Sequence, residues 1–127
     1  MEIKTKGQVE AEISEVVTKF KREHVGKGPE EVKSYIIDDM VVIRLKGALT
    51  TYEQQLIDAP ESIELIKQCR VCCLKNAQSI LRDLLHNLLD VDITSFYVDV
   101  NPKIGEIFVV LSLSQNVESK FKEKRDY

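Results

Sequence analysis

Three cysteines lie close together in the chain, at Cys69, Cys72 and Cys73. On a helix their side chains share one face, and the CxxC spacing of the first two could hold a soft metal ion or form a redox pair. A tetrahedral metal site needs further ligands, and the histidines of the chain are His24 and His86. The site would have to be assembled across a dimer, so we expect reduced, buried thiols and neither a metal nor another cofactor.

Two short motifs could bind a phosphate group or a metal ion. Gly26-Lys27-Gly28-Pro29 is rich in glycine, but a phosphate-binding loop has the pattern GxxxxGK[ST] between a strand and a helix. Here a helix is expected before the motif and a strand after it, which favours a helix terminus. Asp38 and Asp39 could offer oxygen ligands to Mg²⁺ or Ca²⁺, but aspartate is also common in tight turns, and we favour the turn.

Basic residues form a third candidate group. Arg44 and Lys46 point the same way from a predicted strand, and with Lys33 they could form an anion-binding or partner-binding patch, or a solvated rim. We find no catalytic motif in the sequence. It lacks a Ser, His and Asp in the chain order of a known catalytic triad, a nucleophile elbow, an HExxH motif and a matched pair of carboxylates. We therefore expect no enzymatic activity and no catalytic residues.

The composition is that of a globular protein. The 127 residues include 18 basic and 21 acidic ones, a net charge of −3, which is opposite to what a binder of RNA or DNA uses. The sequence has no apolar run long enough for a membrane span and no apolar signal core, so we expect a cytoplasmic protein without membrane insertion. One domain should cover residues 1–127, with a core over about 7–113 and a polar, solvated tail over 114–127.

Hydrophobic periodicity predicts two main helices and two hairpins. The first helix runs from Gly7 to His24, and Thr5 with Gln8 could form a capping box at its start. One long helix is expected between Glu61 and Asp90. Its apolar stripe would contain Ile66, Cys69, Cys73, Ala77, Ile80, Leu84 and Leu88, widened by Leu65, Cys72, Leu81 and Leu85. With hairpins over 32–46 and 93–113, the fold class is α+β, two-layer, with an antiparallel sheet and the order α-β-β-α-β-β.

Both faces of the predicted sheet carry apolar residues. If Ile37 pairs with Met40, one face of the first hairpin contains Val32, Ser34, Ile36, Val41, Ile43 and Leu45, and the other contains Lys33, Tyr35, Ile37, Met40, Val42 and Arg44. In the second hairpin, Phe96, Val98 and Val100 share one face, and Tyr97, Phe108 and Val110 lie partly on the other. Because two helices cover one face only, we expect a partner subunit on the second face.

Several segments resemble a bacterial family. The stretch Gly26-Lys27-Gly28-Pro29, the segment from Tyr35 to Thr50 (YIIDDMVVIRLKGALT) and the segment from Asp99 to Glu106 (DVNPKIGE) look like the MpsC family, which is named after a Na⁺-translocating, membrane-potential-generating system. The likeness runs from about Gly7 to Leu113, although the cysteines depart from the usual Arg/Glu-rich helix. The resemblance implies a cytoplasmic accessory protein of a membrane ion or inorganic-carbon uptake system, and it brings no established catalytic residues.

Two hypotheses for the function follow. The first is a non-enzymatic, homo-oligomeric interaction module that also contacts a subunit of a membrane transport complex, and the alternative is a sensor of a small anion or nucleotide that uses Lys27, Arg44, Lys46 and Lys103. The candidate partner-binding or anion-binding residues are Lys27, Gly28, Tyr35, Asp38, Asp39, Val42, Arg44, Lys46 and Lys103.

Overall fold

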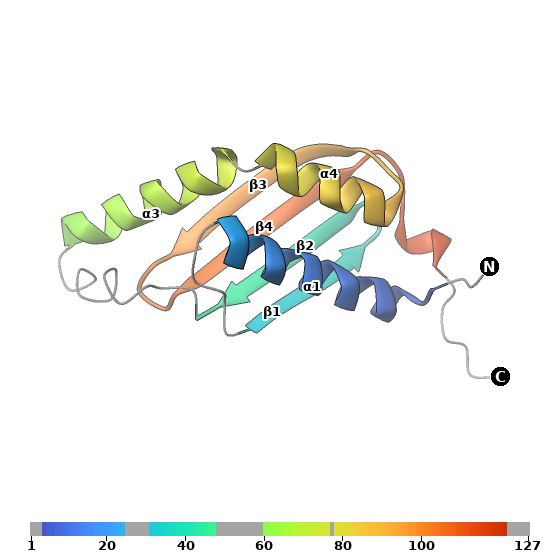
Figure 1. The fold of residues 1–127 in the computed structure, drawn as a ribbon, viewed down its shortest axis with the longest axis horizontal. Coiled ribbons are helices and arrows are strands. Elements are labelled where there is room, and N and C mark those ends of the chain that lie inside the picture. Colours follow the sequence, from blue (N-terminus) through green and yellow to red (C-terminus); the bar gives the residue numbers. More distant parts are fainter. Residues whose placement is uncertain (1–3, 25–30, 48–59, 77, 122–127) are drawn as a thin grey trace.

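The computed structural model describes residues 4–24, 31–47, 60–76 and 78–121. The elements are helix α1 (Lys6–His24), strands β1 (Glu31–Ile37) and β2 (Met40–Lys46), helices α3 (Pro60–Asn76) and α4 (Gln78–Leu89), strands β3 (Ile93–Asn101) and β4 (Glu106–Leu113), and the 3-10 helix η1 (Glu118–Lys120). The strands form one antiparallel sheet in the order β1-β2-β4-β3, and α1 and α4 cross the same face of it (Figure 1). The predicted α+β class and the order α-β-β-α-β-β are confirmed, with two helices, α3 and α4, in place of the second helix.

Helix α1 begins with the predicted capping box. The Thr5 hydroxyl accepts the backbone N–H of Gln8 at 3.2 Å, and the Gln8 side chain accepts the N–H of Thr5 at 2.9 Å. These bonds satisfy two donors that the start of the helix would otherwise leave unpaired. The apolar stripe of α1 is buried against the sheet through Val9, Ile13, Val17 and Phe20.

The first hairpin has the predicted register. Ile37 pairs with Met40 across the turn, and Asp38 has φ of 52°, a left-handed conformation that aspartate tolerates better than most residues. The face predicted to be internal is the core face, on which Ser34, Ile36, Val41, Ile43 and Leu45 are buried and Val32 is half-buried. The Ser34 hydroxyl lies 2.8 Å from the hydroxyl of Ser14 on α1, so the buried polar group has a partner.

The prediction of one long helix is wrong, because two helices, α3 and α4, occupy that part of the chain. A straight helix over the predicted range would be about 45 Å long. The longest strand has nine residues, or about 30 Å. The sheet is therefore too short to bury such a helix along its whole length. Instead, α4 packs against α1 and β3, and α3 packs against β3. None of the helices in the described ranges combines the length and apolarity that a membrane span requires.

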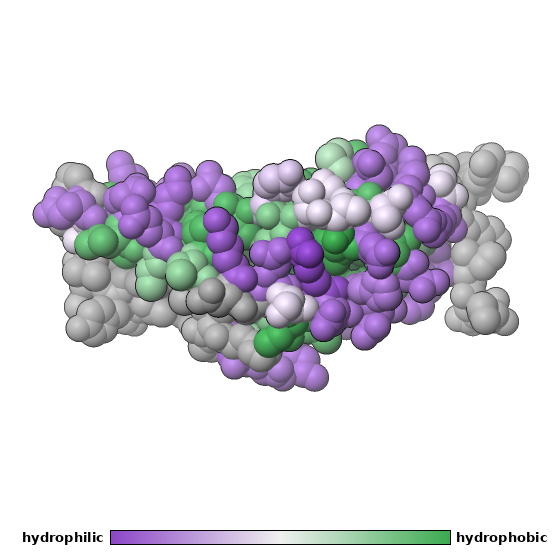
Figure 2. Space-filling model, turned by 90° about the horizontal axis from the view of Figure 1, so that it is seen from above, coloured by the Kyte–Doolittle hydropathy of each residue, from purple (hydrophilic) through white to green (hydrophobic). Residues whose placement is uncertain are grey.

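The predicted stripe of the long helix is also wrong in its orientation. On α4 the buried residues are Leu81, Leu85 and Leu89, whereas Ile80 and Leu84 are exposed. On α3 Ile66 is buried, but Leu65 is 64% exposed, and Cys69 and Cys72 are exposed rather than buried. Apolar patches accordingly interrupt the polar surface in the view from above (Figure 2). Among the α3 side chains that the structure describes, Ile66 and Val71 pack inward, whereas Leu65, Cys69 and Cys72 face solvent.

The expectation of a solvated tail from residue 114 is wrong for the segment after β4. Val117 is 1% exposed and belongs to the hydrophobic core. Its backbone N–H donates to the Asp38 carbonyl at 3.0 Å, and the N–H of Leu113 donates to the Asp39 carbonyl at 2.8 Å. The segment therefore packs against the turn between β1 and β2. Composition alone suggested solvation because polar residues surround this valine.

Candidate functional site

The side of the sheet opposite α1 and α4 carries residues from all four strands, and we call it the open face. Side chains alternate between the two sides of each strand, so the residues that lie between buried core positions point to this face. The pairing aligns them in four rows across β1, β2, β4 and β3: Ile37–Met40–Ser112–Ser95, Tyr35–Val42–Val110–Tyr97, Lys33–Arg44–Phe108–Asp99 and Glu31–Lys46–Glu106–Asn101.

The open face is apolar at its centre. Tyr35, Val42, Val110 and Tyr97 form one continuous row, which we call the tyrosine–valine row. Tyr97 is 60% exposed, and Tyr35, Ile37, Met40 and Phe108 are also exposed large apolar residues. Single exposed apolar residues are common on monomers, but a contiguous patch across a sheet is typical of an interaction site. The predicted site residues Tyr35 and Val42 are thus brought together with Val110 and Tyr97.

Charged residues lie beside the tyrosine–valine row. Arg44 forms an ion pair with Glu106, with Nη2 to Oε2 at 2.7 Å and Nε to the same oxygen at 2.8 Å, and its guanidinium lies 5.7 Å from the centre of the Phe108 ring. Lys33 pairs with Glu31 at 3.3 Å. The guanidinium of Arg44 is therefore already neutralised within the chain, which reduces its value for binding a free anion.

The predicted anion-binding residues are only partly brought together. Arg44 and Lys46 share the open face, and Lys103 lies in the turn between β3 and β4. Lys103 donates its backbone N–H to the Asn101 side chain at 3.2 Å. Lys27 and Gly28, with the rest of the Gly26–Pro29 motif, lie outside the described residues.

Asp99 is the acidic counterpart at the β3 end of the open face. Its carboxylate accepts from Lys67 of α3 at 3.1 Å and from the N–H of Val100 at 2.9 Å. The Lys67 ammonium, helped by that N–H, lowers the pKa of the Asp99 carboxyl. Asp99 therefore stays ionised at neutral pH, and β3 carries a negative charge on a side chain that remains largely exposed.

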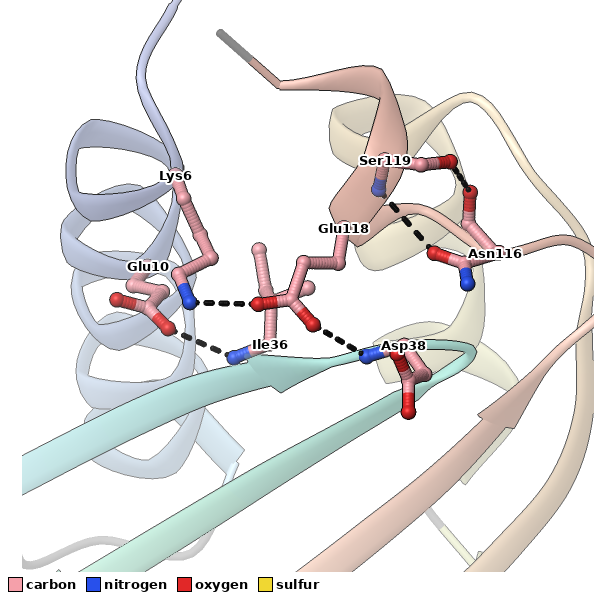
Figure 3. A network of polar contacts seen from close by, with 7 residues as sticks. All are labelled: Lys6, Glu10, Ile36, Asp38, Asn116, Glu118 and Ser119. Carbon is pink, nitrogen blue, oxygen red and sulfur yellow. Dashed lines mark hydrogen bonds and ion pairs between the residues drawn. The ribbon is translucent and has the colours of Figure 1, made fainter. Parts of the chain in front are cut away.

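Asp38 and Asp39 lie in a turn that is held by distant parts of the chain. The Glu118 carboxylate accepts from Lys6 Nζ at 2.7 Å and from the Asp38 N–H at 2.8 Å (Figure 3). Together with the buried Val117, we call these contacts the C-terminal latch. The hydrogen bond from Lys6, followed by that from the Asp38 backbone, lowers the pKa of Glu118. The described residues contain no cluster of three or more His, Cys, Asp or Glu that could hold a metal ion.

A side chain of α1 caps one backbone donor on the outer edge of β1. Glu10 accepts the backbone N–H of Ile36 at 2.7 Å (Figure 3). Because β1 is an edge strand, this N–H would otherwise be available to a strand of another molecule. The open face is therefore a better docking surface than this edge.

Sequence reasoning missed several residues of this site. It recognised that Tyr97, Phe108 and Val110 are apolar but did not place them in the site, because their alignment with Tyr35 and Val42 depends on the pairing of β2 with β4. It gave no sign of the C-terminal latch, whose members are up to 112 positions apart. Local patterns contain no signal for such contacts.

Comparison with known proteins now gives the family. The chain matches the sequence model described as "Na+-translocating membrane potential-generating system (MpsC)" over residues 5–115. It belongs to the MpsC family. The match to this family covers the whole sheet and the helices α1, α3 and α4, and it ends just before Val117 and Glu118.

The curated relatives of this MpsC protein come from Bacillus subtilis (strain 168). The chain is 30% identical to the uncharacterized protein YbcI over 120 residues, which is 94% of this chain and 97% of YbcI. It is 29% identical to the uncharacterized protein YrhF over 68 residues, 54% of this chain and 56% of YrhF. No solved structure matches the chain.

Proposed function

We propose that this protein is a non-enzymatic interaction module that binds another protein through the open face. The observation that carries the proposal is the tyrosine–valine row, which crosses all four strands and is flanked by further exposed apolar side chains. An apolar patch of this kind gains free energy when a partner removes it from water. Within the described residues, the helices pack on the other face and leave this one uncovered.

The charged groups of the open face support a binding role over a sensory one. Arg44 is paired with Glu106, Lys33 with Glu31 and Asp99 with Lys67. A sensor of a small anion would need cations whose charge is not already balanced by the chain. Paired charges around an apolar centre correspond instead to the polar rim of a protein interface.

Family membership supplies the context of the proposal. The family description names a Na⁺-translocating membrane-potential-generating system. In line with that description, we propose that the protein acts on the cytoplasmic side of a membrane ion or inorganic-carbon uptake system, as an accessory that contacts one of its subunits. The contact is made by the open face and not by insertion into the bilayer.

Affinity capture tests the proposed function. The tagged full chain would be used to capture partners from detergent-solubilised membranes of its own organism, with mass spectrometry as the readout. Val42→Glu places a charge in the tyrosine–valine row, and Leu65→Glu places the same charge at an exposed position on α3. We expect a transport-complex subunit to be captured by the wild type and by Leu65→Glu but lost with Val42→Glu. Equal capture by all three proteins would contradict the proposal, provided that circular dichroism shows each to be folded.

A further inference from the structure

The geometry points to a second copy of this chain as an occupant of the open face, related to the first by a two-fold axis that runs parallel to the strands between β2 and β4. This inference rests on the proposed function, in that it uses the same face: a second copy occupies the face in the free protein, and a transport-complex subunit replaces that copy when it binds. A two-fold axis of this kind places β1 opposite β3 of the partner subunit and β2 opposite its β4. Two independent properties of the face agree with this arrangement, and a third sets how tightly the copies bind.

The first property is the symmetry of the tyrosine–valine row. Read from β1 to β3 it is Tyr, Val, Val, Tyr, and it reads the same in the opposite direction. The proposed axis passes through its centre, so each tyrosine faces a tyrosine and each valine faces a valine. Aromatic pairs and small aliphatic pairs then meet in the middle of the interface, where desolvation is greatest.

The second property is the distribution of charge. The half of the open face formed by β1 and β2 carries Lys33, Arg44 and Lys46 against one acid, Glu31. The half formed by β4 and β3 carries Glu106 and Asp99. The proposed axis exchanges these halves, so each half faces a half of opposite charge. Lys33 and Asp99 lie in exposed ion pairs with Glu31 and Lys67, which are weak, so each can exchange its partner within the chain for the other residue across the interface.

The rows specify which charged residues of the two copies face each other across the proposed axis. Lys33 and Asp99 stand at opposite ends of one row, so Lys33 faces Asp99 of the partner subunit. Lys46 faces Glu106 of the partner subunit in the next row. A two-fold axis perpendicular to the strands would instead oppose the row that begins with Ile37 and Met40 to the charged row of Glu31, Lys46 and Glu106. That arrangement buries charge against apolar side chains, which is unfavourable.

The third property is the size of the face. Four strands spaced about 4.8 Å apart and about seven residues long cover roughly 19 by 23 Å. Two such faces in contact have a combined geometric area of roughly 870 Å², which is below the roughly 1,200 Å² at which standard specific interfaces begin, so the dimer should be weak and depend on protein concentration. Sheets packed face to face lie about 10 Å apart and cross at about 30°, so the rows near the axis stay aligned. Glu10 already accepts the backbone N–H of Ile36 on the edge of β1. This N–H is therefore not available for edge-to-edge pairing with a strand of a second copy, which would compete with face-to-face association.

Charge reversal in the full-length protein tests the arrangement, with the mass in solution measured by sedimentation equilibrium over a range of micromolar concentrations. The wild type should form a dimer whose share rises with protein concentration. Lys33→Glu and Asp99→Lys should each weaken dimerisation by about tenfold or more, because each homodimer then contains two pairs of like charges. Both side chains are largely exposed, so the fold should tolerate either change. Lys19→Glu, an exposed charge reversal on α1 away from the open face, should leave the dimer unchanged.

The mixture of the two variants is the decisive sample. In a heterodimer of Lys33→Glu with Asp99→Lys, one contact joins the introduced glutamate to the introduced lysine and the other joins the native Asp99 to the native Lys33. Both contacts are again attractive, so the mixture should dimerise like the wild type. The double variant Lys33→Glu/Asp99→Lys should do the same.

Two results would overturn the inference. If each single variant is monomeric and the mixture stays monomeric, the two residues do not face each other and the axis is wrong. If the wild type is monomeric at about 100 μM, a second copy is not the occupant. In either case the proposed function is judged separately by the capture experiment with Val42→Glu, because that experiment detects a transport-complex subunit and not the mass of the free protein.

Discussion

Replacing Leu85 by alanine should destabilise the protein far more than the same replacement of its neighbour Leu84. The two residues follow each other on α4 and have the same side chain, but Leu85 is 0% exposed and Leu84 is 40% exposed. Leu85 belongs to the buried row with Leu81 and Leu89, whereas Leu84 lies one position, about 100°, further round the helix. The pair therefore measures which face of α4 meets the core.

The size of the difference can be worked out from burial. Leu85→Ala removes three buried carbon atoms, which costs about 2.4 kcal/mol at about 0.8 kcal/mol for each. The cavity that remains adds to this transfer term, and fully buried leucines in other proteins lose about 2.7 to 5.0 kcal/mol on truncation. We expect a loss of about 3 kcal/mol for Leu85→Ala. Leu84→Ala should stay within about 1 kcal/mol, because much of that side chain is in water already and alanine favours the helix.

Urea denaturation followed by circular dichroism measures both variants. For Leu85→Ala, the urea concentration at the unfolding midpoint should be clearly lower than for the wild type, with an unchanged m-value. In thermal unfolding, the melting temperature should fall by about 10 °C for a domain of this size. Leu84→Ala serves as the matched control. Equal losses in the two variants, or a larger loss for Leu84→Ala, would refute the orientation of α4.

Three further predictions concern other parts of the chain. Val117→Ala should cost about 1.5 to 2 kcal/mol in urea denaturation, since its side chain is buried; no measurable loss would mean that the segment after β4 does not pack on the core. Glu118→Gln should destabilise the protein at pH 7, because hydrogen bonds from Lys6 and Asp38 lower the pKa of the native carboxyl. A lowered carboxyl pKa stabilises the fold above the ordinary value of 4.5, and this gain is lost as the pH falls through the native pKa, so the difference between the two proteins should vanish in acid; a constant difference at every pH would contradict this. The exposed Cys69 thiol should react with a soluble thiol reagent in the native protein, and the Cys69→Ser variant should melt within about 2 °C of the wild type; protection of Cys69 until unfolding would show that α3 is covered.

The parts of the fold that local patterns encode could be predicted. The capping box of Thr5 and Gln8, the pairing of Ile37 with Met40 and the division of the hairpin into two faces all depend on residues within a few positions of each other. The two-layer arrangement then follows, because apolar faces of helix and sheet must be buried together. Because side chains alternate along a strand, the sequence also showed that Tyr35 and Val42 make the second face of the sheet apolar.

The features that could not be predicted depend on distant contacts. Periodicity shows that α4 has an apolar side, but Ile80, Leu81, Leu84 and Leu85 are too similar for sequence to decide which of them faces the core. The pairing of β2 with β4 brings Val110 next to Val42 and thereby completes the tyrosine–valine row. Neither local propensity nor hydropathy contains that information.

The C-terminal latch has a consequence for how long the folded state lasts. Its ion pair joins Lys6 to Glu118 across 112 positions, so it closes a loop that contains the whole sheet. Closing such a loop early would cost too much chain entropy, and the contact becomes favourable only after the strands have paired. Interactions that form after the transition state slow unfolding and leave the rate of folding almost unchanged. We therefore expect the short segment after β4 to slow the unfolding of the native protein.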